Sequence, residues 1–264
     1  PRYSGPFGSE LVAGAYLSRL IPLICPLFLI YFFNYKFIYK ILICGLTLIL
    51  FFSVMLTGER ASFLFVLAFI FLYSFFIFRN KISILIKLFI SVILITGILA
   101  NVPEVKKRYS DFYNIIQNFS ESSYGKLYSS AFQLWKLNKI TGVGFKNFRV
   151  NCDIEVTDSS NNTHPLCSTH PHNFYLEILS ETGLIGLTIY SIFLFYLFTQ
   201  VFRKFKLNKN YLSFFQISPI LCMALLIWPI LSAGSFYTSW NGSFFWLYLG
   251  LVLKFNEKNF LLKI

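Results

Sequence analysis

Seven long apolar runs constrain this 264-residue chain more than any other feature. A helix needs about 20 apolar residues to cross roughly 30 Å of hydrocarbon. In lipid, backbone polar groups find partners only within a helix or a closed barrel. We therefore predict an all-α fold, a polytopic bundle of transmembrane helices. The predicted spans are residues 11–33, 37–57, 61–79, 82–100, 173–202, 211–232 and 240–254.

The composition also indicates that lipid is the main solvent of this chain. Apolar residues make up 56% and charged residues only 13%, whereas a soluble domain carries about 25% charged residues. The net charge of +12 would suggest a nucleic-acid partner in a soluble protein. Here the basic residues lie mostly between apolar runs, where they orient a protein in a membrane. We therefore expect membrane lipids, and no nucleic acid, among the partners.

Basic residues are concentrated in alternate connections between the predicted spans. The opposite short connections hold only Arg60, with Arg2 near the start of the chain. Basic-rich short loops face the cytoplasm, so residues 101–172, the one long polar segment, are predicted to be an extracytoplasmic loop. The whole chain, 1–264, is then one membrane-embedded domain, and because it opens with Pro1 we expect a fragment of a longer protein. The basic-rich connections and the C-terminal tail contain Lys36, Lys40, Arg79, Lys81, Arg203, Lys204, Lys206, Lys209, Lys254, Lys258 and Lys263.

Within this loop, residues 122–139 have the spacing of a short amphipathic helix. Leu127, Ala131 and Leu134 would form its apolar face, with lysines elsewhere on the helix. Two interpretations fit: a helix resting on the membrane surface, or a helix packed against the rest of the loop.

Two cysteines, Cys152 and Cys167, lie in the same loop. On the oxidising, extracytoplasmic side of a membrane such a pair is predicted to form a disulfide. Closing a loop of about 15 residues would stabilise the fold by about 3 kcal/mol. The alternatives are two free thiols, or a metal-binding pair with His164 and His170.

The run His170-Pro171-His172-Asn173 leads directly into the fifth predicted span. Asn173 is a good N-cap, so helix should begin there, leaving His172 at the boundary between water and lipid. A neutral imidazole in that position can accept a proton from a hydroxyl near pH 7. A merely solvated loop histidine is the alternative.

The fifth predicted span carries a polar stripe. Glu177 and Glu181 follow Asn173 at four-residue spacing, and Glu181 would lie about 12 Å along the helix. A carboxylate at that depth should face the interior of the bundle. Gly183 and Gly186 are expected to permit close helix packing.

Two arginines share the predicted extracytoplasmic face with His172. Arg60 ends the break between the second and third spans, where a guanidinium can hold a phosphate through paired hydrogen bonds. The alternative is an arginine that extends to the lipid head groups. Arg2 has the same two interpretations, as a phosphate ligand or an interface anchor.

Arg19 lies about eight residues into the first predicted span. A guanidinium at that depth needs a partner. Glu10 and Glu181 are both candidates.

Three segments resemble the signatures of one family. His172-Asn173, nine residues and then Gly183-Leu184-Ile185-Gly186 resembles the signature of O-antigen ligases. Residues 57–62 resemble the arginine segment of that family, and residues 2–8 resemble its upstream Arg-x-x-Gly-x-Phe segment. The resemblance covers essentially the whole chain and points to the membrane glycosyltransferase family (Wzy-C-like) of O-antigen ligases and polymerases. That family has more spans than seven, which implies that N-terminal spans are missing here.

The resemblance implies an inverting glycosyltransferase on the periplasmic side of the bacterial inner membrane. Such an enzyme moves a glycan from undecaprenyl diphosphate to a sugar hydroxyl of the lipid A core, with no cofactor and no metal. His172 would be the base that deprotonates the acceptor, and Arg60 and Arg2 would bind the diphosphate. We expect Asn173, Glu181 and Arg19 to support the site.

Other functions stay open from the sequence. An O-antigen polymerase would use the same donor and a carrier-linked glycan as acceptor, and a third enzyme would transfer the glycan to a protein hydroxyl. A transporter or flippase usually places polar sites near the bilayer midplane, whereas most candidates here cluster at one face.

Overall fold

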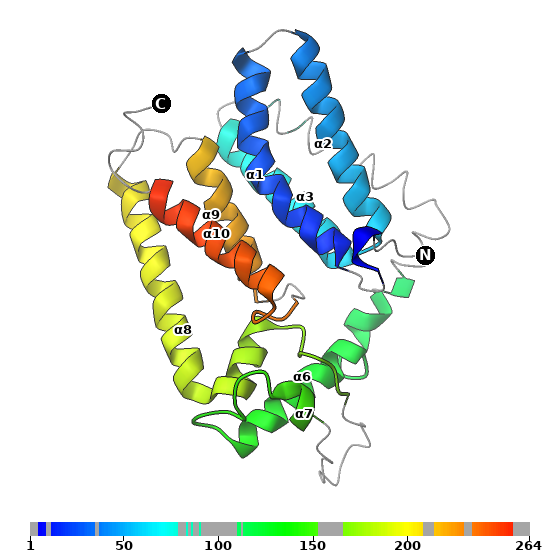
Figure 1. Ribbon diagram of the computed structural model, residues 1–264, viewed down its shortest axis with the longest axis vertical. Helices are drawn as coiled ribbons and strands as arrows, with labels where there is room; N and C mark the ends of the chain where they lie inside the picture. Colours follow the sequence, from blue (N-terminus) through cyan, green and yellow to red (C-terminus); the bar gives the residue numbers. More distant parts are fainter. Residues whose placement is uncertain are drawn as a thin grey trace. The chain divides into compact units, whose positions relative to one another are not determined.

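Within the residues that the structure describes, the chain forms helices at nearly every position where the apolar runs predict them. The computed structural model describes residues 5–8, 12–34, 37–78, 110–111, 113–152, 166–207, 214–229 and 234–255, with the single positions 83, 86 and 90 (Figure 1). Every regular element within these ranges is helical. The chain divides into unit 1 (Pro1–Arg79, Thr199–Leu231 and Gly242–Ile264) and unit 2 (Asn80–Phe198 and Ser232–Asn241).

Unit 1 is a helical bundle built around α1 (Ala13–Asn34). This helix packs against α2 (Phe37–Thr57), α3 (Arg60–Phe78) and α9 (Phe214–Leu226). The short 3-10 helix η1 (Gly5–Phe7) precedes α1, and the Phe7 ring contacts Tyr16 at 5.6 Å between centroids. Tyr16 in turn contacts Phe244 of α10 (Ser239–Phe255).

Proline inside α1 explains one contact of this bundle. Pro26 has no N–H, so the carbonyl of Pro22, four residues earlier, lacks its helical donor. The Ser218 hydroxyl of α9 donates to that carbonyl. A neighbouring helix thus satisfies the backbone group that proline leaves unpaired, as apolar surroundings require.

Unit 2 has its own apolar core. It contains α6 (Ser123–Leu137), α7 (Phe148–Asn151) and the first part of α8 (Phe174–Leu207). The apolar face of α6 is buried, so the prediction of a helix here is confirmed and the interpretation as a helix packed within the loop is favoured. The core consists of Leu127, Ala131, Leu134, Phe148 and Cys152, with Val143, Leu166 and Leu176 packed against it.

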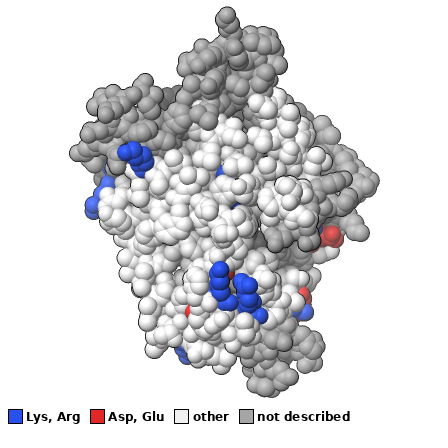
Figure 2. All heavy atoms as spheres, in the orientation of Figure 1, with Lys and Arg blue, Asp and Glu red and all other residues white. Residues whose placement is uncertain are grey.

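Two helices among the described residues are long and apolar enough to cross a membrane, Arg60–Ile77 and Phe174–Arg203. Both keep large apolar side chains exposed, for example Phe71, Phe75, Ile189 and Phe195, as contact with lipid would require. Figure 2 shows that uncharged residues cover most of the described surface in its view. Helices occupy all the predicted spans except 82–100, which lies almost entirely outside the described residues. The all-helical fold is confirmed, and the seven crossings stay a prediction.

Helix α8 is broken at Gly183, which has φ 66° and ψ −162°. Residues 139–144 run beside the break and satisfy its backbone groups. The Val143 and Gly144 amides donate to the carbonyls of Ser180 and Glu181, at 3.0 and 2.9 Å. The Leu184 and Ile185 amides donate to the carbonyls of Lys139 and Ile140, at 2.9 and 3.2 Å.

The break corrects the expected role of Gly183. A Cβ on Gly183 would lie 2.2 Å from the Ile140 carbonyl oxygen, so glycine admits a loop backbone there, not a helix. A Cβ on Gly186 would meet the side chain of Thr182 in its own helix. The expected packing of a helix against Gly183 is therefore wrong, whereas the packing expected at Gly186 stays a prediction. Glu181 lies before the break, in the same helical segment that follows Asn173, and its depth in a membrane stays a prediction.

Candidate functional site

His172 is held in a left-handed backbone conformation, with φ 57°. It lies between Pro171, which is fully buried, and the cap of α8. The Asn173 side-chain oxygen accepts the Tyr175 and Leu176 amides at 3.0 and 3.2 Å. Left-handed residues other than glycine are strained, and such strain concentrates at functional sites.

The His172 ring is half-buried beside two other rings. Its centroid lies 4.2 Å from that of His170 and 5.8 Å from that of Tyr124. The site therefore presents a partly accessible imidazole with two neighbouring rings, which suits a base that must meet a substrate hydroxyl.

His170 adds a second imidazole that sequence reasoning did not assign to the site. Its Nδ1 is hydrogen-bonded to the Thr169 hydroxyl at 2.9 Å, while its buried Nε2 has no hydrogen-bond partner among the described residues. Burial, with smaller electrostatic contributions from His172 and Arg149, lowers the pKa of His170 to about 4. His170 is therefore neutral near pH 7.

Two buried carboxylates fasten the N-terminal segment of α8 (residues 174–182) to neighbouring loops. Glu181 accepts the Lys146 and Phe148 amides at 2.7 and 3.0 Å. Glu177 accepts the Phe236 amide at 2.9 Å and the Ser235 hydroxyl. Both carboxylates have backbone partners, so their direct effect is to fix the segment that follows His172.

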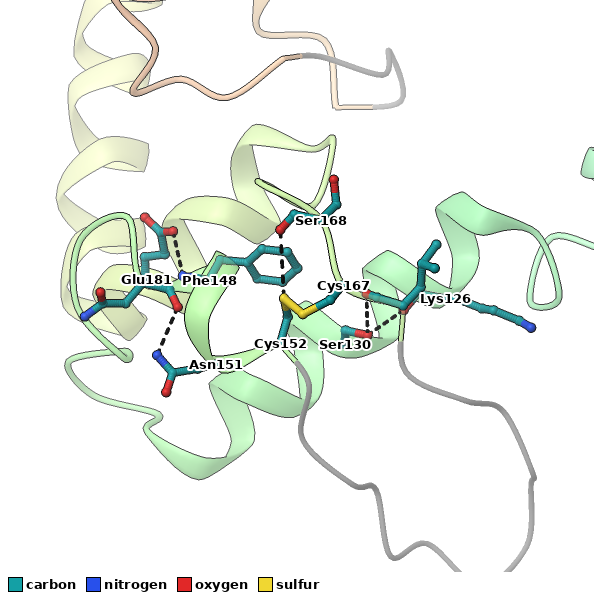
Figure 3. Close-up of a disulfide and its surroundings, with 10 residues drawn as sticks. Lys126, Ser130, Phe148, Asn151, Cys152, Cys167, Ser168 and Glu181 are labelled. Carbon is teal, nitrogen blue, oxygen red and sulfur yellow. Dashed lines mark hydrogen bonds between the residues drawn. A yellow bond between two sulfur atoms is a disulfide. The ribbon is translucent and has the colours of Figure 1, made fainter.

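The Cys152 and Cys167 sulfurs form a disulfide in the structure, with Cα atoms 5.2 Å apart (Figure 3). Cys152 is buried in the core of unit 2, and its sulfur faces the Ser168 carbonyl at 3.8 Å. The bridge ties the end of α7 to the segment that leads into His170. His164 lies outside the described residues, and no group of three or more possible metal ligands gathers in the described part of the chain.

Arg60 is the first residue of α3, in unit 1, and is half-buried. The preceding Gly58 has φ 70° and turns the chain between α2 and α3. Glu59 then accepts the Gly14 and Ala15 amides at 2.8 and 2.9 Å, which satisfies the free N–H groups at the start of α1. Arg60 is thereby fixed at the end of unit 1 where α1 begins.

Glu59 is the residue of this segment that sequence reasoning missed. Its carboxylate also accepts the Ser62 hydroxyl at 2.9 Å. A Cβ on Gly14 would lie 2.3 Å from the Thr57 hydroxyl oxygen, so the approach of α1 to residues 57–59 requires glycine at position 14. The signal in the sequence that could have indicated a role for Glu59 is a carboxylate next to a turn glycine, one residue before a predicted helix.

Arg19 is buried, and its Nη1 donates to the Ala15 carbonyl at 3.3 Å. The carboxylate that acts on it electrostatically is Glu59. Of the two predicted partners, Glu10 lies outside the described residues, and Glu181 belongs to unit 2, where it has other partners. Arg2, the remaining predicted site residue, also lies outside the described residues.

Comparison with protein families connects these features. The model of the O-antigen ligase family matches residues 45–191, more than half of the chain. The chain belongs to the O-antigen ligase family. The match includes Arg60, both bridged cysteines, His172 and Gly183, whereas Arg2 and Arg19 lie before it. A comparison with individual curated proteins finds no match.

Membership in the O-antigen ligase family defines a class of activity. It implies a ligase of the glycosyltransferase type that acts on lipid-linked glycans in a membrane. The two apolar helices are consistent with a membrane-embedded chain.

Proposed function

We propose that the chain transfers a glycan from undecaprenyl diphosphate to a sugar hydroxyl of the lipid A core, at the periplasmic face of the inner membrane. The observation that carries this proposal is the setting of His172. It is a half-buried imidazole on a strained backbone, before a capped helix and within the region matched by the O-antigen ligase family.

In this mechanism His172 accepts the proton of the acceptor hydroxyl as its oxygen attacks the anomeric carbon of the donor. The bond between that carbon and the diphosphate oxygen breaks, and undecaprenyl diphosphate leaves with the bonding electron pair. Attack on the face opposite the leaving group inverts the anomeric configuration. The protein supplies the base and the cations, with no metal or cofactor.

In the proposed mechanism Arg60 and Arg2 bind the diphosphate of the donor and stabilise the negative charge that grows on it as it leaves. The position of Arg60 supports this assignment, because the start of a helix favours anions. Glu59 next to it is engaged by the Gly14 and Ala15 amides and by Ser62.

The periplasmic location rests on two observations. The distribution of lysine and arginine puts the long loop outside the cytoplasm, and the Cys152–Cys167 disulfide fits an oxidising compartment. Family membership favours transfer chemistry over transport.

The acceptor is the part of this proposal that a single assay can decide. Purified protein in detergent is incubated with lipid-linked O-antigen, with and without lipid A-core, and the products are separated by mass. We expect glycan on the lipid A-core. Longer carrier-linked chains, formed without lipid A-core, would make the protein a polymerase and overturn the assignment of the acceptor.

A further inference from the structure

Large apolar side chains are exposed where α6 ends. Leu137, the last residue of α6, is 65% exposed, and Ile140, in the turn that follows, is 66% exposed. The residues that α6 buries in the core of unit 2 are Leu127, Ala131 and Leu134, and neither Leu137 nor Ile140 belongs to this core. Exposed apolar groups that cluster in this way mark an interaction surface.

This turn is attached to the start of the apolar part of α8. The Lys139 and Ile140 carbonyls accept the Leu184 and Ile185 amides, immediately after the break at Gly183. Leu184 and Ile185 are themselves 47% and 52% exposed. Residues 184–207 are long enough to cross hydrocarbon at about 1.5 Å per residue. Backbone hydrogen bonds therefore hold the turn beside the first residues of this apolar segment.

Aromatic and basic side chains surround the turn. The Trp135 indole donates to the Lys139 carbonyl at 3.1 Å, and its ring lies 5.1 Å from that of Phe132. The Lys136 ammonium lies 5.1 Å from the centre of the Phe132 ring. Tryptophan and lysine beside exposed aliphatic groups are the composition of a membrane interface.

We propose that the end of α6 and its turn, residues 135–140, form a lipid anchor on the bilayer that α8 enters. Leu137 and Ile140 insert at the boundary between head groups and acyl chains, and the Lys136 and Lys139 ammonium groups bind phospholipid phosphates. The anchor fixes unit 2 at a set depth in the membrane. It depends on α8 lying in a bilayer and not on the transfer reaction.

A fluorescent label tests the depth of the turn. Ile140→Cys is labelled with bimane in a protein whose Cys25, Cys44 and Cys222 are replaced by alanine, with the disulfide kept. Val150→Cys is the matched control, because Val150 is apolar and 72% exposed and no hydrogen bond ties it to α8. Both proteins are placed in nanodiscs of phosphatidylcholine and phosphatidylglycerol that contain a lipid with a nitroxide on its upper acyl chain.

We expect the nitroxide lipid to quench the label at position 140 several-fold more than the label at position 150. Iodide in the water should show the reverse order. Equal quenching at both positions by the lipid would overturn the anchor. So would protection of position 140 from both quenchers, which would mean that protein covers the turn.

The charges are tested on the same labelled protein. The double substitution Lys136→Glu and Lys139→Glu should reduce quenching by the nitroxide lipid, more strongly with phosphatidylglycerol than with phosphatidylcholine alone. Lys126→Glu, near the start of the same helix, is the control and should leave quenching unchanged. An equal effect of both changes would remove the lysines from the proposal. Because none of these measurements involves transfer, failure of the anchor and failure of the proposed function are distinguishable.

Discussion

His172 and Asn173 are the residues whose placement the sequence predicts best. A good N-cap before an apolar run is a local signal, and Asn173 does cap α8. The left-handed backbone of His172 and its contact with His170 could not be predicted. Both depend on buried Pro171 and on packing within unit 2, which a sequence pattern does not contain.

His170 makes stability depend on pH. Its pKa is lowered to about 4 in the folded protein, against roughly 6.5 for an unfolded histidine. Between these values the unfolded chain binds a proton that the folded chain does not, so acid favours unfolding. We expect the melting temperature to fall as the pH drops from about 6.5 towards 4.

The substitution His170→Asn isolates this contribution. The variant should lose less stability than the original protein over the same pH range, whatever its stability at pH 7.5. Thermal unfolding of both proteins at several pH values measures the two slopes. If the melting temperature depends on pH with the same slope in both proteins, the pKa of His170 does not differ between the folded and the unfolded state.

Arg60 allows a second prediction at this scale. Arg60→Ala should slow transfer by about 100-fold, as expected when one preorganised donor to a developing negative charge is lost. Arg60→Lys should retain part of the rate, since it keeps the charge but not the paired hydrogen bonds. Arg203→Ala is the control, because Arg203 follows the fifth predicted span, on the side of the membrane predicted to be cytoplasmic. Steady-state assays with lipid-linked donor measure both rates. A rate for Arg60→Ala equal to that of this control would remove Arg60 from the site.

At the scale of elements, the apolar runs predicted helices well and their interruptions poorly. The polar residues Ser180, Glu181 and Thr182 precede Gly183, but in the sequence they fit a polar stripe on a straight helix as well as a broken α8. The break depends on residues 139–144, some 40 positions earlier, whose backbone lies against it. Gly142 and Gly144 belong to this segment, and their contact with α8 is tertiary.

Gly183→Ala should destabilise unit 2 by about 1–3 kcal/mol, the usual cost of a strained backbone. The added Cβ would also approach the Ile140 carbonyl oxygen. Gly250→Ala is the matched control: it lies within α10 with open space around it, so it should be neutral or slightly stabilising. Thermal unfolding of both variants in detergent measures the difference. Similar melting temperatures would contradict the tight approach at Gly183.

At the scale of the whole molecule, the sequence predicted the fold class and the family, but less of the site. Composition and apolar length identify an all-helical membrane protein because lipid permits few alternatives. Contacts such as Glu59 with the start of α1 join residues about 45 positions apart. Spacing along the chain does not indicate such pairs, so the partner of Arg19 could not be identified from the sequence.

The state of Cys152 and Cys167 tests the predicted topology. Protein made in bacteria should react with an alkylating reagent at these two positions only after unfolding and reduction. Mass spectrometry of the peptides that contain them measures the labelling. Labelling of unfolded protein without a reductant would contradict an oxidised, extracytoplasmic loop.

The most direct test of the proposed mechanism is the rate at which the His172→Ala variant transfers glycan. The assay is a single turnover with saturating lipid-linked O-antigen and lipid A-core, with binding of the donor measured in parallel. Loss of a general base should slow transfer by about 10²- to 10⁴-fold while donor binding and protein level stay unchanged. A variant that transfers glycan at nearly the original rate would show that His172 is not the base.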